Sequence, residues 1–112
     1  MALIDLIGAD VVKVPLAGKS KDEVIRELLD VLARAGRLDD QRKAYEAVLA
    51  REALGSTGLE NGIAVPHAKT TAVKDLTIAI GVAGSGIDFQ ALDGKPSTLF
   101  FLILAPPDKS GP

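Results

Sequence analysis

Residues 98–105 read Thr-Leu-Phe-Phe-Leu-Ile-Leu-Ala, and this stretch decides the fold class. Every side chain from Leu99 to Leu104 is apolar, so both faces of a strand formed there would avoid water. We therefore expect a central strand in a sheet that is covered on both sides. Two further apolar runs, Ile63 to Val65 and Leu76 to Val82, predict strands beside it.

The N-terminal part predicts a short strand followed by a helix. Val11 to Val14 is the strand candidate, and Pro15 ends it. Ser20 and Glu23 have the spacing of a capping box, and Gly36 supplies a left-handed cap at the other end of the helix. Between them the apolar residues recur at helical intervals: Val24, Ile25, Leu28, Leu29 and Leu32.

A second helix is predicted from a cap at Asp39 or Asp40 to about Leu54, with Gly55 after its end. Because only a few residues join the two helices, we expect them to pack as antiparallel neighbours. The residues assigned to the buried side of this helix are Ala44, Tyr45, Val48 and Leu49.

These elements predict one α/β domain over residues 1–112, a mixed β-sheet flanked by helices. Gly84-Ser85-Gly86 and Asp93-Gly94 indicate turns between strands. With 47% apolar and 25% charged residues, a chain of 112 residues suits a single globular core.

The composition excludes several functional classes. The net charge is −2 and the pI is near 5.3, whereas nucleic-acid-binding domains are normally basic. The absence of cysteine excludes disulfides and thiolate catalysis. No apolar run reaches the ~18 residues of a membrane span, and the N-terminus lacks a basic start. We therefore expect a cytoplasmic location without membrane insertion.

His67 is the strongest candidate for a reactive side chain. It is the only histidine, and a neutral imidazole can act as a nucleophile near neutral pH. The apolar run before it and the rigid Pro66 suggest that it is presented at the end of a strand. A zinc site needs three or four ligands, so one histidine without cysteine predicts no metal site.

Arg51, Ser56 and Thr57 could join His67 in a phosphoryl-transfer site. A histidine that accepts a phosphoryl group needs a free ring nitrogen, a nearby cation and donors for the phosphate oxygens. Arg51 offers a planar fork suited to phosphate, and the hydroxyl groups could serve as donors. Structural roles explain the same residues: a cation at a helix end, hydroxyls that hold a turn and a structural histidine.

A longer set of motifs resembles a known family. Arg51-Glu52, Ser56-Thr57-Gly58 and residues 62–68, Gly-Ile-Ala-Val-Pro-His-Ala, are similar to the signature of fructose/mannitol-type enzyme IIA domains of the bacterial phosphoenolpyruvate-dependent sugar phosphotransferase system (PTS). The resemblance continues at Lys69-Thr70, Val73, Gly86-Ile87-Asp88, Leu92-Asp93-Gly94, Leu99-Phe100-Phe101 and Ala105-Pro106-Pro107.

The resemblance implies a phosphocarrier with a mixed sheet flanked by helices. It implies that His67 accepts a phosphoryl group from the carrier protein HPr and passes it to a IIB domain for sugar phosphorylation. Arg51 would stabilise this group, while Ser56 and Thr57 remain the candidate phosphate-binding residues. No metal or organic cofactor is expected, and any membrane contact would be association with a IIC component.

The family also has a second histidine and a further helix after the proline-containing loop. Neither occurs before Pro112. We therefore expect the chain to be incomplete at its C-terminus, without the C-terminal helix and without that histidine in its site.

Three other functions compete with sugar transport. In the first, similar to nitrogen-branch IIA proteins, the phosphorylation state of the same histidine controls partner proteins. In the second, Gly18-Lys19-Ser20 ends a nucleotide-binding P-loop. That loop needs a glycine five residues before Gly18, where this chain has Lys13, so a turn and a helix cap explain the tripeptide better. In the third, His67 is buried in a purely structural protein.

Overall fold

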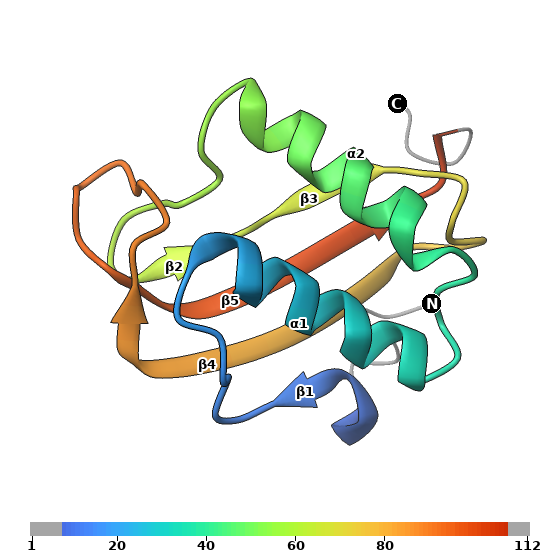
Figure 1. Cartoon of the computed structure of the whole chain (residues 1–112), viewed down its shortest axis with the longest axis horizontal. Coiled ribbons are helices and arrows are strands. Elements are labelled where there is room, and N and C mark those ends of the chain that lie inside the picture. Colours follow the sequence, from blue (N-terminus) through green and yellow to red (C-terminus); the bar gives the residue numbers. More distant parts are fainter. Residues whose placement is uncertain (1–7, 108–112) are drawn as a thin grey trace.

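The computed structural model describes residues 8–107 as a mixed sheet with two α-helices packed over one of its faces (Figure 1). The predicted α/β class is confirmed. In chain order the elements are a 3₁₀ turn η2 (Ala9–Val11), β1 (Val12–Lys13), α1 (Lys21–Arg34), α2 (Gln41–Ala53), β2 (Ile63–Ala64), β3 (His67–Lys69), β4 (Thr77–Ile87) and β5 (Ser97–Ala105).

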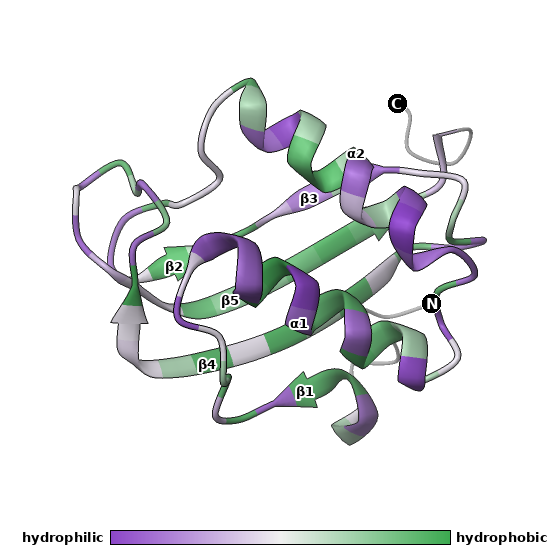
Figure 2. Cartoon of the chain, viewed as in Figure 1, coloured by the Kyte–Doolittle hydropathy of each residue, from purple (hydrophilic) through white to green (hydrophobic). Residues whose placement is uncertain are grey.

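The strand β5 lies at the centre of the five-stranded sheet, as its apolar sequence predicts. It pairs with β4 in antiparallel fashion on one side and with both β2 and β3 in parallel on the other. The short β1 extends the far edge by pairing in parallel with β4. Figure 2 shows β5 as hydrophobic along most of its length, which fits this central position.

The two faces of β5 are covered to different extents. Phe100, Leu102 and Leu104 are fully buried beneath the helices. On the opposite face Leu99, Phe101 and Ile103 are half-buried within the described part of the chain. The predicted cover is therefore confirmed on the helix-covered face, whereas the described residues cover the opposite face only in part.

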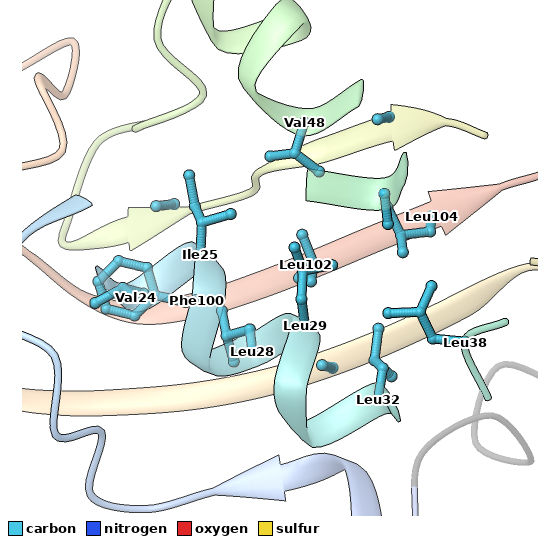
Figure 3. Packing of buried hydrophobic residues seen from close by; sticks show 14 of the residues in the cluster. Val24, Ile25, Leu28, Leu29, Leu32, Leu38, Val48, Phe100, Leu102 and Leu104 are labelled. Carbon is cyan, nitrogen blue, oxygen red and sulfur yellow. The ribbon is translucent and has the colours of Figure 1, made fainter. Parts of the chain in front are cut away.

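The helix α1 supplies most of the core above the sheet. The Ser20 hydroxyl accepts a hydrogen bond from the Glu23 N–H at 3.2 Å, and Gly36 adopts a φ of 74° after the helix end. These caps confirm the predicted bounds. Figure 3 shows the α1 side chains pointing toward β5. All five predicted core positions are fully buried: Val24, Ile25, Leu28, Leu29 and Leu32.

The helix α2 buries a narrower stripe than predicted. The Asp40 carboxylate accepts the Lys43 N–H at 3.0 Å, so Asp40 is the cap. The two helices run in opposite directions in Figure 1, which confirms antiparallel packing. Ala44 and Val48 are fully buried, but Leu49 is 37% exposed. Tyr45 is also only half-buried, because its hydroxyl is held at the surface by hydrogen bonds with the side chains of Asp22 and Arg26.

Two further expectations about strands need correction. Gly84-Ser85-Gly86 makes no turn between strands, because β4 continues through it with a register shift between Val82 and Ile87. Between these paired positions β4 advances five residues, from Val82 to Ile87, while β5 advances two, from Ser97 to Leu99, so β4 holds three extra residues. Gly86 has a φ of 82° within this irregular segment. The strand predicted over Val11–Val14 is shortened to β1. The Asp93-Gly94 turn is confirmed, with Gly94 at a φ of 72°.

Candidate functional site

His67 begins the strand β3 at the edge of the sheet, just beyond a break in the pairing. β2 pairs with β5 at Ala64 and Phe100, and β3 resumes the same register at His67 and Ile103. The break falls at Val65 and Pro66, and proline has no N–H for a sheet ladder. His67 therefore follows the strand β2, as the apolar run predicts, and is itself the first residue of a second short strand.

The His67 ring is exposed and hydrogen-bonded through one nitrogen. Its Nδ1 lies 2.8 Å from the Val65 carbonyl oxygen. A carbonyl oxygen only accepts, so Nδ1 carries the proton and donates it. In the neutral ring this leaves a lone pair on Nε2. Among residues 8–107 the structure shows no hydrogen bond or ion pair to Nε2.

An open hollow of about 530 Å³ brings His67 and Arg51 together. One wall is the C-terminal half of α2 and the other is β3. Two cationic side chains, Arg51 and Lys69, therefore flank the exposed imidazole. The lining residues are Ala47, Ala50, Arg51, Leu54, His67, Ala68 and Lys69.

Lys69 is a site residue that the sequence analysis missed. Along β3, His67 and Lys69 are exposed while Ala68 between them is buried. Successive strand residues point to opposite faces, so residues two apart share a face. That alternation, once a strand is assumed, could have identified Lys69 as a neighbour of His67.

Arg51 has a structural contact at the end of α2 and also lines the hollow beside His67, and its contact with phosphate stays a prediction. Its Nη1 donates a hydrogen bond at 2.8 Å to the carbonyl oxygen of Gly55, the residue after the C-cap of α2, so the cation lies at the end of the helix where the dipole favours it. The same guanidinium lines the hollow with His67. Because a guanidinium has five N–H donors, this single bond leaves further donors for a ligand.

Ser56 and Thr57 hold the loop after α2 and are not among the residues that line the hollow. Thr57 is 3% exposed, and its hydroxyl donates to the Glu52 carboxylate. The Ser56 hydroxyl donates to the Phe89 carbonyl oxygen at 2.5 Å and accepts the Gly58 N–H at 3.0 Å. Both hydroxyl groups thus have protein partners, and their contact with phosphate stays a prediction.

Side chains of α1 accept hydrogen bonds from the backbone N–H groups around Gly18-Lys19-Ser20. The Ala17 and Gly18 N–H groups donate to the Glu27 carboxylate at 2.8–3.0 Å. The Lys19 N–H donates to Glu23 at 2.7 Å. These are the backbone donors that a P-loop would turn toward phosphate. Their occupation agrees with a turn and a helix cap in place of a nucleotide site.

Two features are absent from residues 8–107: a cluster of metal ligands and a membrane-spanning helix. Within residues 8–107 no group of three histidine, aspartate or glutamate side chains is arranged to hold a metal ion. In the same part of the chain, no helix has the length and apolar character that crossing a bilayer requires.

The fold and the site together define a class: a small α/β domain that presents one histidine beside an arginine at the edge of its sheet. A family profile described as "Phosphoenolpyruvate-dependent sugar phosphotransferase system, EIIA 2" matches residues 5–111. The chain belongs to this family.

Relatives of two kinds are similar to the chain. It is 42% identical over 105 residues to the PTS system fructose-specific EIIABC component of Bacillus subtilis, covering 94% of this chain and 16% of that protein. It is 47% identical over 87 residues to the PTS system fructose-specific EIIA component of Haloferax volcanii, covering 78% and 56%. A nitrogen regulatory protein of Pseudomonas aeruginosa is 38% identical over 99 residues, covering 88% and 63%.

Solved structures of a nitrogen regulatory protein and of a mannitol IIA protein are also similar to the chain. The nitrogen regulatory protein IIA-Ntr from Neisseria meningitidis superposes with a TM-score of 0.88 at 33% identity, over 98% of this chain and 75% of that one. IIA mannitol from Escherichia coli gives 0.77 at 26% identity, over 89% and 72%. The chain spans just over half the length of the Haloferax relative and a sixth of the Bacillus one.

Proposed function

We propose that this domain is a phosphocarrier in which Nε2 of His67 accepts a phosphoryl group from a phosphohistidine of an HPr-type protein and passes it to a IIB domain. The observation that carries the proposal is the hydrogen bond from Nδ1 to the Val65 carbonyl oxygen. It fixes the ring and leaves the Nε2 lone pair directed away from that bond. Family membership supports the same reaction class.

The transfer needs no proton movement at His67. The Nε2 lone pair forms a bond to phosphorus while the bond from phosphorus to the donor's imidazole nitrogen breaks, and that electron pair stays on the donor's ring. Nδ1 keeps its proton, which the Val65 carbonyl oxygen continues to accept. The reverse sequence passes the group to the next acceptor. An oriented nucleophile of this kind is the requirement for covalent catalysis.

The charge around the hollow suits a phosphoryl group. Arg51 and Lys69 both line the hollow that contains His67. Positive groups already in place stabilise the negative charge on the transferring group without reorganisation. Arg51 is the proposed clamp because its planar fork can bind two phosphate oxygens at once.

The partners proposed for the domain are proteins that bring a second active side chain to the hollow. Leu54 lines the hollow and is 85% exposed, so it offers an apolar contact beside the charged groups. The Bacillus relative is described as an EIIABC component, as is a 2-O-α-mannosyl-D-glycerate-specific relative from Escherichia coli. These names support a IIB partner, with a IIC component as the proposed route to a membrane.

A regulatory role is the second candidate, and specific relatives favour it. Nitrogen regulatory proteins are 38% identical to the chain in Pseudomonas aeruginosa and 34% in Bradyrhizobium diazoefficiens. In that role the same phosphorylated His67 would change the binding of a partner. Phosphoryl transfer to a IIB domain would favour transport, and binding that depends on phosphorylation without such transfer would favour regulation.

The decisive experiment measures intact mass after incubation with phosphoenolpyruvate, enzyme I and HPr. We expect an acid-labile gain of one phosphoryl group, and no gain in the His67→Ala variant, which should still fold because this side chain is exposed. Since the relatives are longer, the same test is run on a chain extended beyond Pro112. Absence of a gain in both chains, or a gain that survives in His67→Ala, would contradict the proposal.

A further inference from the structure

We propose that Glu52 is a positioning residue for His67, acting through the loop after α2 and the backbone of Val65. The inference rests on the proposed function of His67 as the phosphoryl acceptor. It assigns a role to the ion pair that joins Lys21 of α1 to Glu52 of α2. Glu52 itself is not among the residues that line the hollow.

The Glu52 carboxylate is buried and paired with Lys21. Its Oε2 lies 2.9 Å from the Lys21 Nζ, and the side chains are 6% and 20% exposed. The same ammonium lies 4.9 Å from the Phe89 ring centroid and 3.3 Å from the Gln90 side-chain oxygen. Removing one partner of such a pair leaves a buried charge uncompensated, so the pair fixes the geometry around it.

Local helix chemistry does not account for either charge. Lys21 is the first residue of α1, where the helix dipole disfavours a cation. Glu52 lies in the last turn of α2, where the dipole disfavours an anion. Each side chain therefore stands at the unfavourable end of its own helix dipole, and its position is explained by contacts with other elements of the fold. Such departures from local preference are expected where function constrains the fold.

The remaining contacts of Glu52 fix Thr57. The Thr57 hydroxyl donates to Oε1, and the Thr57 N–H lies 3.2 and 3.3 Å from the two carboxylate oxygens. These bonds close the loop between α2 and the sheet. Because Thr57 is almost fully buried, its backbone has little freedom to shift while the carboxylate stays in place.

Thr57 in turn holds the residue that orients the histidine. Its carbonyl oxygen accepts the Val65 N–H at 3.0 Å, and the Val65 carbonyl oxygen accepts the proton on Nδ1 of His67 at 2.8 Å. A continuous path therefore runs from the Glu52 carboxylate to the ring nitrogen opposite the proposed nucleophile. The hydrogen bond at one ring nitrogen of a histidine sets which nitrogen carries the proton. This path therefore favours the tautomer with the proton on Nδ1 and a free lone pair on Nε2.

The test reads the tautomer directly by ¹⁵N NMR of the imidazole. His67 is the only histidine, so all ring signals belong to it. We expect the Nδ1–H form in the original protein and a mixture of tautomers in Glu52→Gln. The kcat for phosphoryl transfer should fall on the order of tenfold, less than the ~hundredfold that a 1 Å misplacement can cost, with KM for phospho-HPr little changed.

The matched control is Glu46→Gln, the same substitution on the same helix. The Glu46 carboxylate pairs with Arg42 at 3.7 Å, and these side chains are 65% and 88% exposed. We expect this variant to keep both the tautomer and the transfer rate. An equal change in both variants would overturn the inference, because it would show a general response to loss of charge on α2.

A second variant covers the case in which Glu52→Gln does not fold, as judged from its amide spectrum. Thr57→Val keeps the shape of the side chain but removes the hydroxyl, and should shift the tautomer in the same direction by a smaller amount. An unchanged tautomer in every folded variant would overturn the inference even if His67 is phosphorylated. A shifted tautomer in a protein that never accepts a phosphoryl group would contradict only the proposed function.

Discussion

Glu27 and Glu52 form two regions built from the same contacts but with different consequences. Each carboxylate projects from a helix and pairs with a lysine Nζ at 2.9 Å. Glu27 accepts the N–H groups of Ala17 and Gly18, and Glu52 accepts the N–H and the hydroxyl of Thr57. At Glu27, which pairs with Lys13, the loop N–H groups donate to the carboxylate. At Glu52, which pairs with Lys21, the loop residue Thr57 also accepts the Val65 N–H, and the Val65 carbonyl oxygen accepts the proton of His67.

The difference separates a candidate phosphoryl-accepting site from a sequence that only resembles a phosphate-binding loop. Gly18-Lys19-Ser20 has suitable residue types, but its loop donors are occupied by Glu23 and Glu27. The loop after α2 is equally well bonded, yet the chain beyond it leaves one ring nitrogen of His67 without a partner among the described residues. An available atom, rather than a motif, therefore distinguishes the two regions.

Replacing Arg51 should give the largest change in the rate of phosphoryl transfer. This prediction tests whether the region around His67 is a functional site. We expect Arg51→Ala to slow phosphoryl transfer about a hundredfold, because one preorganised charged donor is lost. Arg51→Lys should slow it about tenfold, since the charge stays and the fork is lost. Rapid-quench measurement of phosphohistidine formation gives both rates. The control is Arg42→Ala, an exposed arginine on the same helix, and rates equal to this control would remove Arg51 from the site.

Breaking the Glu27 region should affect stability and spare the transfer rate. Glu27→Gln weakens three charge-assisted hydrogen-bond contacts at a carboxylate whose side chain is 12% exposed. We expect the free energy of unfolding in urea to fall by about 1–3 kcal/mol. Asp30→Asn, on the same helix in an exposed pair with Arg34, should stay within about 1 kcal/mol. A tenfold loss of transfer in Glu27→Gln would show that the two regions are not separate.

Lowering the pH should test the Glu27 region further, through a smaller change in the free energy of unfolding. Burial alone would raise the pKa of Glu27, but the Ala17 N–H, Lys13 and the Gly18 N–H together hold this pKa below its usual value. A lowered pKa stabilises the folded state above the usual glutamate value of about 4.3, and this contribution is lost as pH falls through the folded-state pKa. The stability gap between the original protein and Glu27→Gln should therefore narrow below about pH 4. A gap that stays constant down to about pH 3 would contradict this account.

The parts of the fold that depend on neighbouring residues were predictable from the sequence. The Ser20 cap, the α1 core positions and the Asp93-Gly94 turn each follow from a few consecutive residues. The prediction for Leu49 is wrong because helical periodicity does not show how wide a stripe of α2 is buried. The prediction of a turn at Gly84-Ser85-Gly86 is wrong because glycine permits an irregular strand as well as a turn.

The candidate site was predictable in its residue types but not in its connections. His67 and Arg51 were singled out from their chemistry, and the fold places both at one hollow. The pairing of Lys21 with Glu52 joins residues from two different helices, and no local pattern encodes it. For the same reason, the sequence could not show that the Ser56 and Thr57 hydroxyl groups already have protein partners.

The parallel pairing of β5 with the edge strands bears on the order in which the molecule assembles. His67 and its strand partner Ile103 are 36 residues apart (103 minus 67). During synthesis, Arg51 and His67 are made before β5, the strand with which β3 pairs. Long-range parallel pairing is slow compared with helix formation, because a loop must close first. His67 should thus take its place at the edge of the sheet only in a late stage of folding, when β5 enters the sheet.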